Sequence, residues 1–292
     1  MGCCQIGLSL AISPKMGDVC QTTGRFSLRF RSDNRNAAHV SVMLGGQRFK
    51  GVDATHYSVR DETNGLRRKY MDVSTAVAMR RSIRCFKDAP VDLDILRDVL
   101  DKARAAPSGG NVQPWHATVL HGDRLARLVE EMGAALMAGP GHEVPEYRIY
   151  PDDLSEPYRG RRARNGEAMY AALGITREDK AGRMRQLARN FGFFGAPVGL
   201  FVHMPRLMGP PQWADLGIWL QTVMLLLVEA GLGSCPQEAW SAYPVTVKRV
   251  AEIPDDHLLF CGLAIGVPDP EAAFNHFPND RAALEEMVHF RD

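Results

Sequence analysis

Apolar positions after residue 70 repeat at two spacings, one typical of helices and one typical of strands. A period of three to four residues follows Asp92, a residue suited to cap a helix, and the period stops at Pro107. Alternating or unbroken apolar runs predict strands, and the unbroken run at 258–266 is typical of a strand covered on both faces. The predicted helices are 73–79, 93–103, 124–137, 178–192, 212–230 and 245–253, and the predicted strands are 115–121, 197–203 and 258–266.

The most apolar of these helices is 212–230. Its apolar run, 216–228, has 13 residues with Gln221 among them. A membrane span needs about 18–20 residues, so the run predicts a helix buried in a core or an interface. Residues 138–160 are instead rich in Gly, Pro and polar residues, and they predict a long loop that could act as a lid. Since strands and helices alternate only loosely, the fold class is α/β or α+β with a central sheet.

The first 70 of the 292 residues differ from the rest in charge. They hold 11 Lys and Arg against 5 Asp and Glu, whereas 71–292 holds 24 against 29, and the total is +1. A balanced total argues against nucleic-acid binding through overall charge. Residues 61–70 form a polar linker without a hydrophobic period. We therefore expect residues 1–70 to be a basic, poorly ordered extension, or an upstream addition to a chain that naturally starts at Met71, followed by one domain at 71–292. The Arg-rich, acid-poor residues 20–50 would also suit an organellar transit peptide, and Met1-Gly2 leaves lipidation of the N-terminus open.

Six cysteines are spread along the chain without a CxxC pair or a Cys/His metal spacing. This predicts free thiols in a reducing compartment, and hence a cytoplasmic protein without a metal site. The short apolar run at 216–228 likewise predicts no membrane segment.

Four polar clusters carry candidate chemistry, and two of them lie near the start of the domain. Arg80, Arg81, Ser82 and Arg84 offer several donors to a phosphate or another anion, although a solvated basic surface would use the same residues. Residues 107–115 (PSGGNVQPW) combine glycines, which let the backbone approach a ligand closely, with amide side chains that suit the edge of a heterocycle. A helix-to-strand turn is the alternative for this second cluster.

The third cluster, 231–238 (GLGSCPQE), reads as a helix end and turn whose backbone N–H groups could face a ligand. In the fourth, 274–281 (FNHFPNDR), Arg281 could complete an anion site. The chain has no GxGxxG after a strand, no GxxxxGK[ST] and no GxSxG, so the common nucleotide loops and the serine-hydrolase elbow are not indicated. Cys235 has no histidine partner that the sequence places beside it, which argues against a cysteine nucleophile.

These clusters resemble the FMN-dependent nitroreductase family, in its nitrobenzoate-reductase-like branch. The resemblance rests on motifs that follow one another in the family's order over 71–292: MRRSIRCF, APSGGNVQPWH, FFGAPVGLF, GLGSCPQ, AIGVPDP and NDRAALEEMVHF. It implies an α+β fold with a central, mostly antiparallel sheet between helices. It also implies a homodimer whose two active sites lie at the subunit interface, with helix 212–230 in the dimer core.

Carried over to this chain, the resemblance implies a set of cofactor-binding residues. Arg80, Arg81, Ser82 and Arg84 would hold the FMN phosphate, ribityl chain and pyrimidine edge, and Arg281 would meet the phosphate. Pro107, Ser108, Asn111 and Gln113 would meet the flavin, largely from the partner subunit or across the ring, and Pro236 and Gln237 would cover it near N5. Related chains often carry a second arginine where this chain has Pro278, so its phosphate clamp would have one cation fewer.

The implied activity is ping-pong reduction of a nitroaromatic or quinone acceptor by NAD(P)H through flavin N5, with no protein acid, base or nucleophile. Alternatives on the same fold are reductive dehalogenation, flavin fragmentation, or flavin binding without catalysis. The expected substrate pocket is aromatic: Tyr147, Tyr158, Phe193, Phe194 and Trp219.

Overall fold

The computed structural model describes residues 42–44, 47–49, 71–139 and 141–292. The chain divides into two units, Met1–Lys69 and Tyr70–Asp292. In the first unit, β1 (Val42–Leu44) and β2 (Gln47–Phe49) form an antiparallel pair. The other residues of the basic extension lie outside the described part of the chain, and so do the expectations that concern them.

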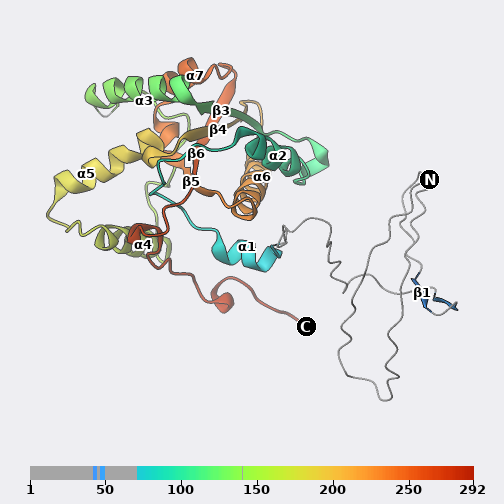
Figure 1. Ribbon diagram of the computed structural model, residues 1–292. Coiled ribbons are helices and arrows are strands. Elements are labelled where there is room, and N and C mark those ends of the chain that lie inside the picture. The colour runs from blue at the N-terminus through green and yellow to red at the C-terminus, as the bar shows by residue number, and fades with distance from the viewer. Residues whose placement is uncertain (1–41, 45–46, 50–70, 140) are drawn as a thin grey trace. The chain divides into compact units, whose positions relative to one another are not determined.

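The second unit is built on a four-stranded antiparallel sheet (Figure 1). Its strands are β3 (His116–His121), β4 (Val198–Pro205), β5 (Gly233–Gln237) and β6 (His257–Gly266), in the order β3-β4-β6-β5. The central pair, β4 and β6, is almost entirely buried, as the unbroken apolar runs predict. The antiparallel sheet with surrounding helices confirms the predicted α+β class.

Helices cover both faces of this sheet because successive side chains of a strand point to opposite faces. Leu200 and Val202 of β4 face α2 and α6, whereas Phe201 between them faces α3, α7 and a short 3-10 helix, η3. Asp92 caps α2, and its side chain accepts a hydrogen bond from the Asp94 amide at 2.8 Å. The helical elements are α1 (Val73–Met79), α2 (Leu93–Ala103), α3 (Gly122–Met137), α4 (Tyr158–Ala172), α5 (Lys180–Ala188), η3 (Arg189–Gly195), α6 (Pro210–Glu229) and α7 (Pro244–Ala251).

The structure differs from the predicted elements in three places. β5 forms where the sequence pattern indicates a turn, because Gly233–Gln237 pairs with β6 through its backbone despite its glycine and proline. α4 was not predicted, and none of its residues is buried, so no apolar period marks it. The predicted helix 178–192 is shorter: α5 ends at Ala188, and η3 continues through Phe193 and Phe194 at φ 48° and 56°.

The stretch expected to act as a lid is tied to the domain at its start. The Glu143 carboxylate accepts hydrogen bonds from the backbone amides of Val245 and Thr246, at 2.6 and 3.1 Å, and so caps α7. Three residues later, Glu146 pairs with Lys248 at 2.5 Å and accepts from the Leu259 amide at 2.7 Å. Glu143 and Glu146 thus hold this part of the loop against α7 and β6, and its action as a lid stays a prediction.

Among the described residues, no helix has both the length and the apolar character to cross a bilayer.

Candidate active site

The first and third polar clusters lie side by side. After α1 the chain becomes extended, and Ser82 forms a parallel bridge with Ser234 of β5 while the Ile83 amide donates to the Ser234 carbonyl at 2.9 Å. Arg80 and Arg84 thereby come close enough to Cys235 to offset part of the rise that burial causes in the pKa of its thiol. Residues 82–83 thus lie along the outer edge of β5, and Phe86 bridges Pro268 just after β6.

Asn275 brings the fourth cluster to the same place. Its Oδ1 accepts hydrogen bonds from the amides of Arg84 and Cys85, at 3.0 and 3.1 Å. Its Nδ2 donates to the carbonyls of Cys85 and Asp269, at 2.8 and 2.9 Å. The side chain is 3% exposed. Asn275 was not singled out from the sequence, although it belongs to the FNHFPNDR motif that was.

Arg80, Arg81 and Arg281 lie close enough together for their charges to affect one another, and Arg81 and Arg281 are exposed. Burial lowers the pKa of Arg80, and repulsion from Arg281 and Arg81 lowers it further. Within the described ranges, none of Arg80, Arg81 and Arg281 forms an ion pair with a carboxylate. Neighbouring cations without a protein counter-ion form a site suited to a multiply charged anion such as a phosphate.

Arg84 is fixed by a neighbour that the sequence did not reveal. The Arg189 guanidinium donates to the Arg84 carbonyl at 3.1 Å and to Gln186 at 3.3 Å. The guanidinium carbons of Arg84 and Arg189 each lie 5.8 Å from the centre of the Phe194 ring. Phe194 is thus a support for two arginines and not a pocket wall.

The side chain of Gln237 is already bound within the protein. Its Nε2 donates to the Asn190 carbonyl at 2.7 Å, and its Oε1 accepts from the Trp240 indole at 3.3 Å. What β5 offers a ligand at Pro236 and Gln237 is therefore backbone. The sequence analysis did not single out the next residue, Glu238. Burial raises the pKa of its carboxyl.

The second cluster forms a tight loop. Gly110, Asn111 and Gln113 have φ of 56°, 57° and 51°, a left-handed conformation that glycine and asparagine tolerate best. The Ser108 hydroxyl accepts from the Gln113 amide at 2.9 Å, and the Gln113 side chain donates to the Asn111 carbonyl at 3.1 Å. Pro107, Asn111 and Gln113 are exposed. No described hydrogen bond or ion pair joins this loop to the arginines of the same chain.

Three of the five residues of the predicted aromatic pocket, Phe193, Phe194 and Trp219, have little exposed surface. Phe193 has no exposed surface: its ring packs on Trp240 with centroids 4.5 Å apart and occupies the space that a side chain at Gly199 would fill. Trp219 is 4% exposed and stacks on Trp115 inside the core. The prediction of a pocket rested on aromatic content. Aromatic content does not reveal that a glycine such as Gly199 leaves space in the core for the Phe193 ring.

The remaining two aromatic residues keep some exposure. Tyr147 packs edge-on against Trp213 and donates its hydroxyl to the Phe260 carbonyl, and burial raises its pKa. It lines a groove of about 580 Å³ together with Tyr150. Tyr158 begins α4 and is exposed.

Comparison with known proteins identifies the family of this chain. The family model described as "Nitroreductase family" matches residues 77–267. The chain belongs to the nitroreductase family. A 4-nitrobenzoate reductase of Pseudomonas putida is 34% identical over 222 residues, which cover 75% of this chain and 95% of that protein.

Two solved nitroreductases are also similar. The FMN- and NADPH-dependent nitroreductase NfnB of Sphigopyxis sp. strain HMH superposes with a TM-score of 0.75 at 50% identity, covering 76% of this chain and all of that one. The FMN-dependent nitroreductase NfnB of Mycobacterium smegmatis, solved in complex with NADPH, gives 0.71 at 30% identity over 76% of this chain and all of that one.

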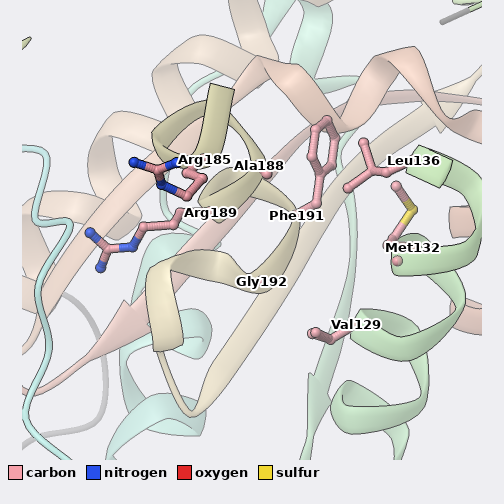
Figure 2. Close-up of a pocket in the computed structure, with 9 residues that line it drawn as sticks. Val129, Met132, Leu136, Arg185, Ala188, Arg189, Phe191 and Gly192 are labelled. Carbon is pink, nitrogen blue, oxygen red and sulfur yellow. The ribbon is translucent and has the colours of Figure 1, made fainter. Parts of the chain in front are cut away.

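A second groove of this nitroreductase, of about 320 Å³, lies between α3 and the segment formed by the end of α5 and η3. Figure 2 shows Val129, Met132, Leu136 and Phe191 along it, while the guanidinium groups of Arg185 and Arg189 point away from these apolar side chains. The groove thus lacks a polar group directed into it and forms no part of the candidate site.

In the described residues of this family member, no group of three or more His, Cys, Asp or Glu side chains could hold a metal ion.

Proposed function

We propose that this protein is an FMN-dependent NAD(P)H oxidoreductase that reduces nitroaromatic or quinone acceptors. The observation that carries the proposal is the junction of Arg80, Arg81 and Arg281, whose neighbouring charges have no protein counter-ion among the described residues. The donor set fits a flavin phosphate, and the names of the similar proteins supply the flavin and the acceptor class.

In this proposal the three arginines hold the FMN phosphate. Arg81 also donates to the Phe277 carbonyl at 3.4 Å, which holds it beside the C-terminal segment. Because Arg81 is already one of the three arginines, Pro278 still leaves the clamp one cation short of that in related chains.

Ser82 and Arg84 would hold the ribityl chain and the pyrimidine edge. Asn275 and Arg189 bind the backbone of Arg84, and its guanidinium donates to the Ser82 carbonyl at 3.3 Å and lies over the Phe194 ring. Its charge is thereby placed where it would stabilise negative charge on the reduced ring. Pro236 and Gln237 would contribute backbone groups, since the Gln237 side chain is already bound.

When bound, FMN accepts a hydride from NAD(P)H and passes two electrons to the acceptor. The chain's own residues bind and orient the reactants, and we assign none of them as an acid, a base or a nucleophile.

We further propose a homodimer in which loop 107–113 of one subunit completes the flavin site of the other. The support is that this loop, with Pro107, Ser108, Asn111 and Gln113, makes no described contact with the arginines of its own chain. Apolar side chains are also left exposed on three elements that an interface could cover: Val73 and Val77 of α1, Ile218 of α6, and Phe290 near the C-terminus.

Acceptor binding would involve Tyr147 and Tyr158, the two predicted aromatic residues that retain exposed surface. Cys85, Cys235 and Cys261 are free thiols, which supports a reducing compartment, and we place the activity in the cytoplasm.

The visible spectrum of the purified protein tests the proposal. We expect a flavin spectrum that bleaches anaerobically with NADPH or NADH and returns when 4-nitrobenzoate is added. A flavin that neither nicotinamide reduces would refute hydride transfer and favour a binding role. A protein that is colourless and takes up no added FMN would refute the cofactor itself.

A further inference from the structure

Asp215 is a buried carboxylate with an incomplete set of partners. It lies on α6 and is 6% exposed, beside core residue Leu216. Its Oδ1 accepts one hydrogen bond, from the Gly109 amide at 3.2 Å. Its Oδ2 is buried and has no donor among the described residues. Burying a carboxylate oxygen without a donor is unfavourable, so an acid here favours a further donor that the described residues do not supply.

The unpartnered oxygen lies next to the loop that the proposed function assigns to the flavin. A Cβ atom placed on Gly109 would lie 4.0 Å from Oδ2. The loop's internal hydrogen bonds, from the Asn111 amide to the Ser108 carbonyl at 3.0 Å and from the Val112 amide to the Gly109 carbonyl at 3.1 Å, fold it into a turn. The Gly109 contact with Asp215 joins that turn to α6.

We propose that Asp215 is a positioning residue for this loop. Oδ1 holds the Gly109 amide, and Oδ2 accepts a hydrogen bond from an N–H or O–H group that arrives when the cofactor site is completed. This inference rests on the proposed function. The donor comes either from the flavin or from the second subunit, and the chemistry at Oδ2 is the same for both.

Replacing the carboxylate with an amide separates positioning from a structural role. Asp215→Asn retains an oxygen for the Gly109 amide but places an NH₂ group where a donor should arrive. We expect the unfolding free energy of the flavin-free protein to stay the same or rise, because a buried charge is removed. We expect the dissociation constant for FMN to rise about tenfold, because an acceptor has become a donor. A purely structural role would not weaken binding while preserving stability.

Asp215→Ala removes both oxygens and provides a readout that needs no flavin. In the flavin-free protein, hydrogen exchange at the amides of 109–113 should become faster than in the wild type. Asp98→Asn on α2 is the matched control: this exposed carboxylate pairs only with Lys102, so its loss removes one charge without touching the loop.

FMN binding is measured by quenching of flavin fluorescence and self-association by sedimentation velocity. Weaker FMN binding with unchanged self-association identifies the flavin as the donor, and weakening of both identifies the second subunit. Asp215→Asn protein that binds FMN like the wild type overturns the inference alone. Wild-type protein that binds no FMN overturns the proposed function, and the inference falls with it.

Discussion

Replacing Asn275 with alanine should weaken both the fold and the proposed cofactor site. The amide makes four hydrogen bonds, two accepted from the amides of Arg84 and Cys85 and two donated to the carbonyls of Cys85 and Asp269. Each is worth about 1 kcal/mol net, and the groups left behind are half-buried, so water compensates only in part. We expect Asn275→Ala to lower the unfolding free energy by about 2–4 kcal/mol.

Asn275→Asp sharpens this prediction. Its carboxylate keeps the two accepted hydrogen bonds but turns a second oxygen toward the carbonyls of Cys85 and Asp269, where it repels them. Protonation restores one donor, so the penalty should shrink as the pH falls toward the pKa of the new carboxyl. Asparagine does not titrate, and the wild type has no such dependence at this position.

Urea denaturation followed by circular dichroism measures these changes, with Asn279→Ala as the control for an exposed asparagine in the same segment. FMN titration provides the functional readout, because Arg84 loses its anchor and should bind the flavin less tightly. If Asn275→Ala is as stable as Asn279→Ala, the hydrogen-bonding argument for this junction is wrong.

Three further predictions concern charge, packing and pH. Arg80→Ala should weaken FMN binding about 10- to 100-fold through loss of a charged contact to the phosphate, as measured by flavin fluorescence. Gly262→Ala would place a Cβ atom 2.3 Å from the buried Trp240 ring, and should cost about 2–4 kcal/mol in urea denaturation. Burial, together with the neighbouring His257 and His116, lowers the pKa of His203 to about 4. The unfolded chain therefore takes up this proton first, and the unfolding free energy should fall by up to about 3 kcal/mol between pH 6.5 and 4.

Each of these has its own control. Riboflavin lacks the phosphate, so Arg80→Ala should bind it like the wild type, and equal weakening for both flavins would contradict a phosphate contact. Gly133→Ala lies in α3 with no atom within 4 Å of the added carbon, and it should be neutral or mildly stabilising. His203→Asn should flatten the acid limb of the stability profile, and a slope identical to the wild type would exclude His203 as its source.

Local pattern was sufficient for elements that bury an apolar face. α2 is marked by Asp92 at its start and by buried Leu96 and Val99, and the buried strands β4 and β6 read directly as apolar runs. α4 buries no residue, so its helical conformation leaves no apolar period in the sequence. β5 is held by backbone pairing with β6, which composition does not encode.

The site residues were predictable by type, and the resemblance implied one phosphate site for Arg80, Arg81 and Arg281, but the contact that joins their segments was not predicted. The arginines of 80–84 and Arg281 stand out as anion ligands, yet the contact that joins their segments comes from Asn275, a residue with no charge to draw notice. Phe193 was misplaced because its position depends on Gly199, which leaves room for the ring on β4. Such fits are three-dimensional and become visible only when both elements are placed.

The pairing of Ser82 with Ser234 also protects the sheet from other chains. β5 is the last strand of the sheet, and an uncovered outer strand offers its free amides and carbonyls to any extended segment nearby. Segment 82–83 covers part of that edge, and Pro236 removes one amide donor from it. The segment that presents the arginines is thus also a guard against edge-to-edge aggregation. Variants that loosen segment 82–83 should therefore aggregate, and so decrease in the soluble fraction of cells, before their cofactor binding is impaired.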